Sequence, residues 1–335
     1  MTAKQTQASA QTMQLQQVFD LYEQRIRLVE QKIMELFSNR ASIIPLIGNH
    51  IISSGGKRLR PLFHLLCADL AGYQGNADIE IAGIIESIHT ASLLHDDVVD
   101  MADVRRGKPT ANSIWGNQVV VLVGDFLYSN ALRAAVLLKN QRIMESLSAA
   151  TTRMTEGELL QLNRIGDVDI TEEEYMEIIA AKTGALISAA CRVGAILGNL
   201  PEDKENALAD FGMKTGIVFQ MADDILDYMA NEGELGKKLG KDLEEGKVTL
   251  PLLHLIHAAG DHEVNEIKEI IREDFSEKGI GRILLLLKQY RSIEASFEKA
   301  SALVTEAQER LSVFPDSAAK QALLAIAAYS LRRDK

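Results

Sequence analysis

The sequence is poor in the residues that mark several common classes of protein. Aromatic residues make up 5% of the 335 positions, proline occurs 6 times and cysteine occurs 2 times. Two cysteines cannot build the disulfide framework of a small secreted domain. Cys67 and Cys191 each lie in an apolar stretch and are expected to be buried free thiols. The longest apolar runs, VVVLVG and ILLLL, fall short of the roughly 18 residues of a membrane span, so no stable membrane insertion is expected.

Several short functional motifs are also missing from the sequence. It has no Walker motif, no zinc-ligand spacing and no glycine-rich dinucleotide fingerprint. The net charge of −11 argues against a nucleic-acid-binding protein. The first residues are polar and rich in glutamine, unlike a signal peptide. These absences predict a cytoplasmic protein that does not bind nucleic acid.

Helical periodicity dominates what is present. Ala, Leu, Ile, Glu and Lys are abundant, and apolar positions recur at helical spacing from residue 15 to the end. Residues 1–14 are expected to form a flexible tail, and no linker composition divides residues 15–335. Thr171 with Glu174 forms a capping box at a helix start. We therefore predict one all-α domain after the tail.

Aspartates end two of the predicted helices in the same pattern. LLHDDVVD (93–100) carries Asp96, Asp97 and Asp100, and Asp223, Asp224 and Asp227 repeat the DDxxD spacing. Carboxylates four apart on one helix face repel each other, and the negative end of the helix dipole adds to this cost. A single such pattern also fits a solvated acidic helix end, but two copies favour a shared cation site. Such oxygen ligands suit Mg²⁺ shared with a diphosphate.

Basic residues cluster in short segments near these motifs. GGKRLRP (55–61) and the RRG after the first aspartates place cations on glycine-flanked turns, and three lysines follow in the second half, Lys182, Lys237 and Lys247. Arginine suits bidentate phosphate contacts and lysine suits point-charge neutralisation. Solvated loop charges are the alternative interpretation for each lysine. The clustering favours a polyanion site.

His89 lies two helical turns before Asp96, on the same face. By itself it also fits a satisfied core histidine. Glu86 and His89 form an E-x-x-H pattern, which di-iron helical bundles use, but those bundles need two such motifs and two further glutamates. The sequence contains one, which disfavours the di-iron alternative.

Together these segments resemble the trans-isoprenyl diphosphate synthases, a family of prenyltransferases. The motifs that carry the likeness occur in order: GGKRLRP, LLHDDVVD with RRGKPT, GDFLYSNAL, EGELLQL, AAKTGAL, FQMADDILDY and GKDLEEGKVTLP. The likeness covers roughly residues 40–335 and is greatest to bacterial octaprenyl and heptaprenyl diphosphate synthases. It implies an all-α, isoprenoid-synthase-type helical bundle around a deep central cavity. It also implies Mg²⁺-dependent, head-to-tail condensation of isopentenyl diphosphate onto an allylic primer, geranyl or farnesyl diphosphate.

The resemblance also implies a role for each motif residue. Several Mg²⁺ ions would be bound by Asp96, Asp100, Asp223 and Asp227, with Asp97 and Asp224 in support. The allylic diphosphate would be held by Arg105, Lys182, Thr183, Gln220, Lys237 and Lys247, with Thr183 and Gln220 lining the reaction centre. Isopentenyl diphosphate would be held by Lys57, Arg60, His89 and Arg106. Lys238, where a small or neutral residue is expected, is a local departure from the family pattern.

Product length is predicted from the two residues five and four positions before Asp96. Ala91 and Ser92 stand where short-chain family members carry bulky aromatics, so the tunnel should stay open beyond C20. C40 is the favoured product, with C35 or C45–C50 behind it, and the product would feed quinone side-chain synthesis. Phe126, Met154 and Phe219 are candidates for a deeper floor.

The sequence leaves two other functions open. A partner-dependent or non-catalytic subunit of a heteromeric synthase would usually lack one or both aspartate motifs. A class I terpene cyclase would lack the GGKRLRP site and carry more aromatics. Family resemblance predicts a homodimer.

Overall fold

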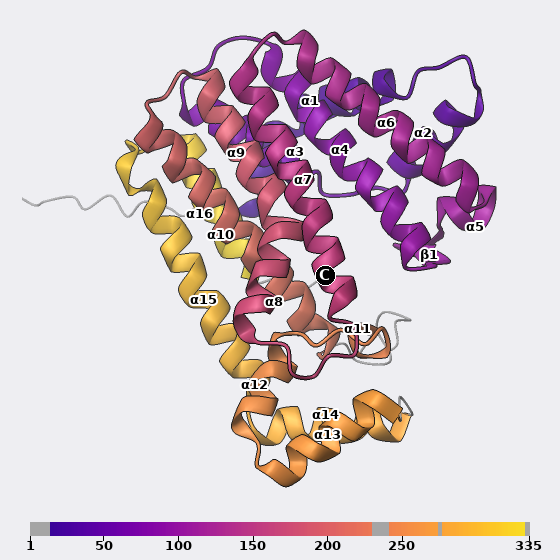
Figure 1. Ribbon diagram of the computed structural model, residues 1–335. Helices are drawn as coiled ribbons and strands as arrows, with labels where there is room; N and C mark the ends of the chain where they lie inside the picture. The colour runs from indigo at the N-terminus through magenta and orange to yellow at the C-terminus, as the bar shows by residue number, and fades with distance from the viewer. Residues whose placement is uncertain (1–13, 230–240, 274–276, 332–335) are drawn as a thin grey trace, which may run out of the picture.

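The computed structural model describes residues 14–229, 241–273 and 277–331, and regular structure in these ranges is almost entirely helical. Helices are packed side by side in a bundle, with one short hairpin at its edge (Figure 1). The elements of the first half are α1 (Leu15–Leu36), α2 (Ile43–Ser53), α3 (Leu59–Leu70), α4 (Ala77–Val99), β1 (Val104–Arg105), β2 (Lys108–Pro109), α5 (Ala111–Trp115), α6 (Asn117–Leu137) and α7 (Gln141–Asn163). Those of the second half are α8 (Glu172–Ile179), a π-helical turn (Ala180–Gly184), α9 (Ala185–Leu197), α10 (Glu202–Asp227), α11 (Lys241–Glu244), α12 (Leu250–Ala258), α13 (Asp261–Glu273), α14 (Glu277–Gln289), α15 (Ser292–Arg310), a 3₁₀ turn (Leu311–Val313) and α16 (Ala318–Leu331).

The helices α4 and α10 form the inner part of the bundle. α4 is apolar on most sides, with Ile81, Ile84, Ile85 and Ile88 all buried, and such a helix is stable only when neighbours surround it. It packs against α1, α3 and α6, while α10 packs against α9, α15 and α16. Both helices end in an aspartate motif, so their packing decides where the carboxylates meet.

Close contact between α3 and α9 joins the two halves of the bundle. A Cβ at Gly194 would lie 2.7 Å from Cys67 Cβ and 2.8 Å from the backbone nitrogen of Ala68. The missing side chain therefore lets the two helix backbones approach. Cys67 and Cys191 lie in this region and are free and buried, which confirms the prediction for both.

Helix positions largely match the periodicity of the sequence, and the Thr171–Glu174 capping box is confirmed. Two local features differ from the expectation. The segment after the first aspartates, predicted as a loop, forms the β1–β2 hairpin. The helix that carries AAKTGAL widens into a π-helical turn at Ala180–Gly184. The predicted tail falls outside the described residues except for residue 14.

Two helical stretches have the length and apolar composition of a membrane span. The stretch Glu172–Leu197 has 78% of its apolar window buried, as befits a helix of the core. The other, α6, has 33% of its window buried. Leu122 and Leu137 on α6 are 67% and 61% exposed. An apolar surface of this kind marks an interaction site more often than a solvated face.

Candidate active site

A cavity of about 760 Å³ opens at the end of the bundle where α4 and α10 finish. Both aspartate motifs contribute to its wall, and so do the segment before α3, the hairpin and the π turn. The predicted site residues that line it are Lys57, Arg60, His89, Ser92, Asp96, Asp100, Arg105, Arg106, Lys182, Thr183, Gln220 and Asp223. Residues that the sequence separates widely are thus gathered around one space.

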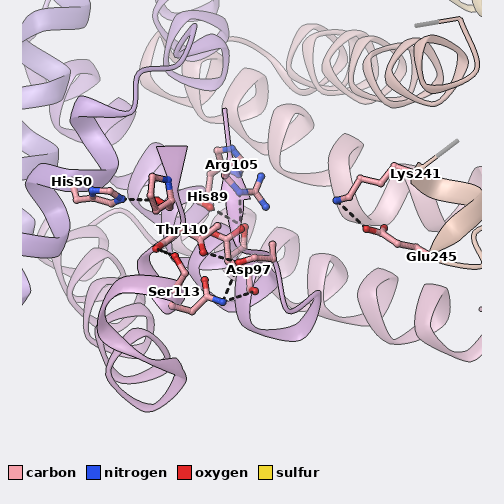
Figure 2. Close-up of polar contacts among 12 residues, drawn as sticks. His50, His89, Asp97, Arg105, Thr110, Ser113, Lys241 and Glu245 are labelled. Carbon is pink, nitrogen blue, oxygen red and sulfur yellow. Dashed lines mark hydrogen bonds and ion pairs between the residues drawn. The ribbon is translucent and has the colours of Figure 1, made fainter. Parts of the chain in front are cut away.

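The first aspartate motif divides into two faces. Asp96 and Asp100 line the cavity, whereas Asp97 is buried and accepts a hydrogen bond of 2.7 Å from Arg105 Nε. Figure 2 shows the contact between Asp97 and Arg105, which is a residue of β1. Burial, and then the charge of Glu158, raises the pKa of Asp96 to about 6, although Lys182 opposes the shift. The positive charges near Asp96 therefore do not offset the cost of burying its carboxylate.

The β1–β2 hairpin joins the first aspartate motif to the loop before α3. Its two-residue turn places Arg106 at φ 53° and Gly107 at φ 73°, the left-handed values that this tight turn requires. From this turn Arg106 Nη1 donates to the carbonyl oxygen of Gly55, and Lys108 Nζ donates to that of Ser53 at 2.6 Å. The two basic segments found in the sequence are therefore held as one unit.

The π turn presents Lys182 and Thr183 to the cavity. Lys182 Nζ forms an ion pair of 2.6 Å with Glu158 on α7 and a hydrogen bond with Gln161. Thr183 Oγ1 donates to Gln220 Oε1 on α10 at 2.9 Å. π turns carry one extra residue and occur often at functional sites. Sequence reasoning selected Lys182 and Thr183 but assigned no role to Glu158, which lies in the EGELLQL motif.

The second aspartate motif also has an open and a buried side. Asp223 is exposed at the cavity, while Asp224 is buried and accepts hydrogen bonds from Tyr175 Oη at 2.6 Å and Gln220 Nε2 at 2.8 Å. Burial raises the pKa of Asp224 to about 6, against the lowering effect of these two hydrogen bonds. Asp227 Oδ2 accepts a hydrogen bond of 3.0 Å from the backbone nitrogen of Asp242.

Asp242 is a carboxylate of the site that sequence reasoning did not select. Burial, followed by the charges of Asp224 and Asp227, raises its pKa to about 7. Lys247 opposes that shift, and its Nζ forms an ion pair of 2.6 Å with Glu245. Asp242 and Lys247 line a smaller recess next to the main cavity. The signal was present in the GKDLEEGKVTLP motif, of which only Lys247 was selected.

Cations form the opposite wall of the cavity. Lys57 donates to the hydroxyl of Tyr329 on α16, and its Nζ lies 4.9 Å from the centre of that ring. Burial, followed by the charges of Arg60 and Arg106, lowers the pKa of His89 well below its usual value. The imidazole is therefore neutral at pH 7. Tyr329 had no signal in the sequence, because nothing local links it to Lys57.

Several predicted residues lie away from the main cavity. Ala91 is 1% exposed and belongs to the hydrophobic core, whereas its neighbour Ser92 lines the cavity. Of the floor candidates, Met154 and Phe219 line the cavity, and Phe126 is not among its lining residues. Lys237 and Lys238 lie outside the described residues.

The carboxylates suit a metal ion that is shared with a ligand. Within the described ranges, no three His, Cys, Asp or Glu side chains come close enough to hold a metal ion by themselves. The donors on the cavity face are carboxylate oxygens, and Mg²⁺ commonly binds one or two of these together with water and phosphate oxygens. The residues present therefore fit Mg²⁺ held together with a diphosphate.

Comparisons with known proteins agree with this geometry. The polyprenyl synthetase family model matches residues 41–284. Octaprenyl diphosphate synthase of Escherichia coli K12 is 40% identical over 323 residues, which cover 96% of this chain and 100% of that protein. Among solved structures, decaprenyl diphosphate synthase from Rhodobacter capsulatus superimposes with a TM-score of 0.91 at 37% identity, covering 96% of this chain and 99% of that one.

A second solved structure is informative about ligands. Polyprenyl synthase from Caulobacter crescentus, complexed with calcium and isoprenyl diphosphate, has a TM-score of 0.91 and 36% identity and covers 97% of this chain and 99% of that one. These matches confirm the predicted all-α isoprenoid-synthase fold. By its sequence and its structure, the chain belongs to the polyprenyl synthetase family of prenyltransferases.

Proposed function

We propose that this protein is a long-chain all-trans-polyprenyl diphosphate synthase. It extends an allylic primer, geranyl or farnesyl diphosphate, with isopentenyl diphosphate in the presence of Mg²⁺. The observation that carries this proposal is the meeting of two aspartate motifs, from α4 and α10, across a cavity whose other wall is basic. One diphosphate fits between the carboxylates through metal ions, and the second fits the cations near α3.

The chain's own residues have distinct roles in this reaction. Arg105 and Lys182, now paired with Asp97 and Glu158, would exchange these carboxylates for the allylic diphosphate. Lys247 and, outside the described residues, Lys237 would add to this neutralisation. Magnesium, when bound, supplies charge stabilisation to the diphosphate as the allylic C–O bond breaks. Asp96, Asp100, Asp223 and Asp227 would hold it, and Asp97 and Asp224 would orient their neighbours.

The second substrate would lie against Lys57, Arg60, His89 and Arg106. Its double bond attacks the allylic carbon, the new C–C bond forms, and a proton then leaves to the released diphosphate. The residues at the reaction centre, Thr183 and Gln220, are hydrogen-bonded to each other, which fixes the orientation of both side chains. Neutral His89 donates a hydrogen bond without adding charge. No side chain is needed as a nucleophile.

Product length follows from the wall behind Asp96. Ser92 is small and lines the cavity, so an elongating chain meets no bulky side chain there. We propose C40 as the main product, with C35 and C45–C50 as the next candidates. A quinone side chain is the destination that suits a product of this length.

Two alternative functions are less well supported. A terpene cyclase ionises one diphosphate and has no use for the second basic wall formed by Lys57, Arg60 and Arg106. A partner-dependent subunit does not need two intact aspartate motifs on its own chain. We also propose that the protein works in the cytoplasm as a homodimer, because the exposed apolar face of α6 suits a second copy of the chain.

A product assay tests the proposal. Purified protein is incubated with Mg²⁺, farnesyl diphosphate and labelled isopentenyl diphosphate, and the products are sized, with a chelator as control. We expect a metal-dependent ladder that ends near C40. Products that stop at C20, after a single addition, would contradict the open tunnel. A folded protein that incorporates nothing alone would favour the partner-dependent subunit, and conversion of farnesyl diphosphate without isopentenyl diphosphate would favour a cyclase.

A further inference from the structure

Glu86 places a carboxylate in a wall of the cavity that is otherwise rich in cations. It lies on α4, one turn before His89, and its side chain is 7% exposed. It is the glutamate of the E-x-x-H pattern in the sequence, and the proposed reaction gives Glu86 itself no role. An unpaired carboxylate here would repel an incoming diphosphate. Its charge therefore has to be engaged elsewhere.

The partner of Glu86 is Arg58. Glu86 Oε1 accepts from Arg58 Nη1 at 3.3 Å, and Glu30 Oε1 on α1 accepts from Arg58 Nε at 3.0 Å. The Arg58 side chain is 6% exposed, and its Nη2 makes no hydrogen bond within the residues that the structure describes. Removing one carboxylate partner from a buried charge is costly. The two glutamates thus anchor one guanidinium between α1 and α4.

The backbone of Arg58 explains why such an anchor is needed. Its φ is 47°, a left-handed value that residues other than glycine adopt rarely. It is the residue before α3, it gives that helix no side-chain cap, and it lies between Lys57 and Arg60. A backbone of this kind persists only where the surroundings fix it. The anchored guanidinium supplies that restraint.

A second crowded contact lies beside the anchor. A Cβ at Gly56 would lie 2.7 Å from Arg106 Nη1 and 3.4 Å from Arg58 Nη1, so both guanidinium groups flank this glycine. Burial, followed by the charges of Arg58 and Arg105, lowers the pKa of Arg106, and Glu86 acts in the opposite direction. Glu86 therefore offsets part of the repulsion among these cations.

We propose that Glu86 is a positioning residue for isopentenyl diphosphate. Its carboxylate fixes the guanidinium of Arg58, and Arg58 in turn fixes the turn that presents Lys57 and Arg60 to the second substrate. This inference rests on the proposed function, because it assigns the basic wall to isopentenyl diphosphate. It predicts an effect on one substrate and not on the other.

Steady-state kinetics of Glu86→Gln test this role. The substitution keeps the shape of the side chain and removes its charge. We expect KM for isopentenyl diphosphate to rise about tenfold, since small displacements of binding groups are costly. The kcat and the KM for farnesyl diphosphate should stay close to those of the wild type, because the aspartate wall is untouched.

Asp78→Asn is the matched control. Asp78 lies on the same helix, is as buried as Glu86, and pairs with Arg25 outside the cavity. It should lower the thermal stability without changing KM for isopentenyl diphosphate. Arg58→Gln should raise that KM as Glu86→Gln does. The double variant should be no worse than the worse single one, because both substitutions break the same link.

The outcomes separate this role from the proposed function. A folded wild-type chain that incorporates no isopentenyl diphosphate would overturn both. With an active wild type, three results would overturn the positioning role alone. The first is a KM for isopentenyl diphosphate that is unchanged or lowered in folded Glu86→Gln. The others are an equal rise of this KM in Asp78→Asn and additive effects on it in the double variant. If Glu86→Gln does not fold, Glu30→Gln removes the more exposed anchor of the same guanidinium. Glu30→Gln should show the same rise, and an unchanged KM would overturn the role.

Discussion

At the scale of single residues, the site contains buried carboxylates whose negative charge is not fully offset by the cations around them. Burial raises the pKa of Asp96 and Asp224 to about 6 and that of Asp242 to about 7. Each shift means that neighbouring charges and hydrogen bonds do not offset the cost of burying the ionised carboxylate. A divalent cation would supply the missing charge. Two predictions follow at this scale: Ser92 tests the space for the product, and Asp242 tests the role of the cation.

The first prediction concerns product length. Ser92→Phe places an aromatic ring in the cavity wall, so the product should shorten from about C40 to C20 or less, as the family resemblance implies. Ala91→Phe should shorten it as well, but with a loss of stability, because Ala91 is packed in the core and overpacking costs about 1–3 kcal/mol. Product sizing and thermal denaturation check both variants. Unchanged products from both would contradict the tunnel assignment.

The second prediction concerns Asp242. Asp242→Asn should raise the Mg²⁺ concentration for half-maximal activity by about tenfold, because groups that support metal ligands typically contribute this much. Glu244→Gln is the control, since Glu244 lies two residues away and is exposed. Activity is measured against Mg²⁺ at saturating substrates. An identical Mg²⁺ dependence in both variants would show that Asp242 takes no part.

The sequence predicted the members of the site better than their partners. The DDxxD spacing placed Asp96 and Asp100 on one face, because residues four apart on a helix lie one above the other, and both line the cavity. It could not indicate that Glu158 pairs with Lys182, since a contact between different helices has no local signal. The left-handed backbone of Arg58 was equally hidden, because glycine is the residue that usually marks it. Tertiary packing decides features of this kind.

At the scale of secondary structure elements, the packing can be tested at the close contact between α3 and α9. The backbones approach because Gly194 has no side chain. His64 lies in the same contact, fully buried, with its Nδ1 donating to the carbonyl oxygen of Ala190 at 3.0 Å. Burial lowers the pKa of His64 to about 4. Steric and electrostatic predictions follow from these two residues.

The steric prediction compares two glycines in helices. Gly194→Ala should lower the free energy of unfolding by about 1–3 kcal/mol, because its Cβ would meet α3 backbone that cannot move away freely. Gly281→Ala on α14 has nothing within 4 Å of the new Cβ and should stabilise by roughly 0.5–1 kcal/mol. Denaturant unfolding checks both. Equal effects of the same sign would contradict the proposed tight contact.

The electrostatic prediction concerns pH. The folded-state pKa of His64 lies below its ordinary value of 6.5, so the unfolded chain binds its proton first. The contribution of His64 to stability is therefore complete above pH 6.5 and falls by about 3 kcal/mol as the pH drops to 4. His64→Asn keeps a donor for Ala190 and should lose this dependence relative to the wild type. Urea unfolding at several pH values measures the free energy of unfolding of the wild type and of His64→Asn, with His262→Asn, at an exposed histidine, as control. A difference between the wild type and His64→Asn that does not change with pH would contradict the prediction.

At the scale of the whole molecule, one face of the bundle stands out from the rest. Exposed apolar side chains follow α6 at Val121, Leu122, Val136 and Leu137. In Figure 1 this helix lies on the outside of the bundle, beside α4, whose end carries the first aspartate motif. Covering α6 with a second copy would therefore also support the helix that positions Asp96 and Asp100.

The prediction at this scale concerns the oligomeric state. The wild-type protein should sediment with twice the chain mass of 36.9 kDa. Leu122→Glu puts a charge on the α6 face and should give a monomer with much reduced activity. Leu285→Glu on α14 is the control, because that leucine is equally exposed at 64% outside this face. A Leu122→Glu chain that remains a dimer would place the interface elsewhere.

The π turn at Ala180–Gly184 has a consequence for the register of the chain. One added residue rotates the side chains that follow it by about 100° around the helix axis. The apolar faces of α8 and α9 therefore point in directions that one continuous α-helix would not give. Deleting one residue, such as Ala181, would restore a regular helix and rotate α9 relative to α8. Either Lys182 and Thr183 would leave the cavity, or Gly194 would leave α3. A deletion of one residue here would thus reorient every side chain that follows it in the helix, although the composition of the helix would scarcely change.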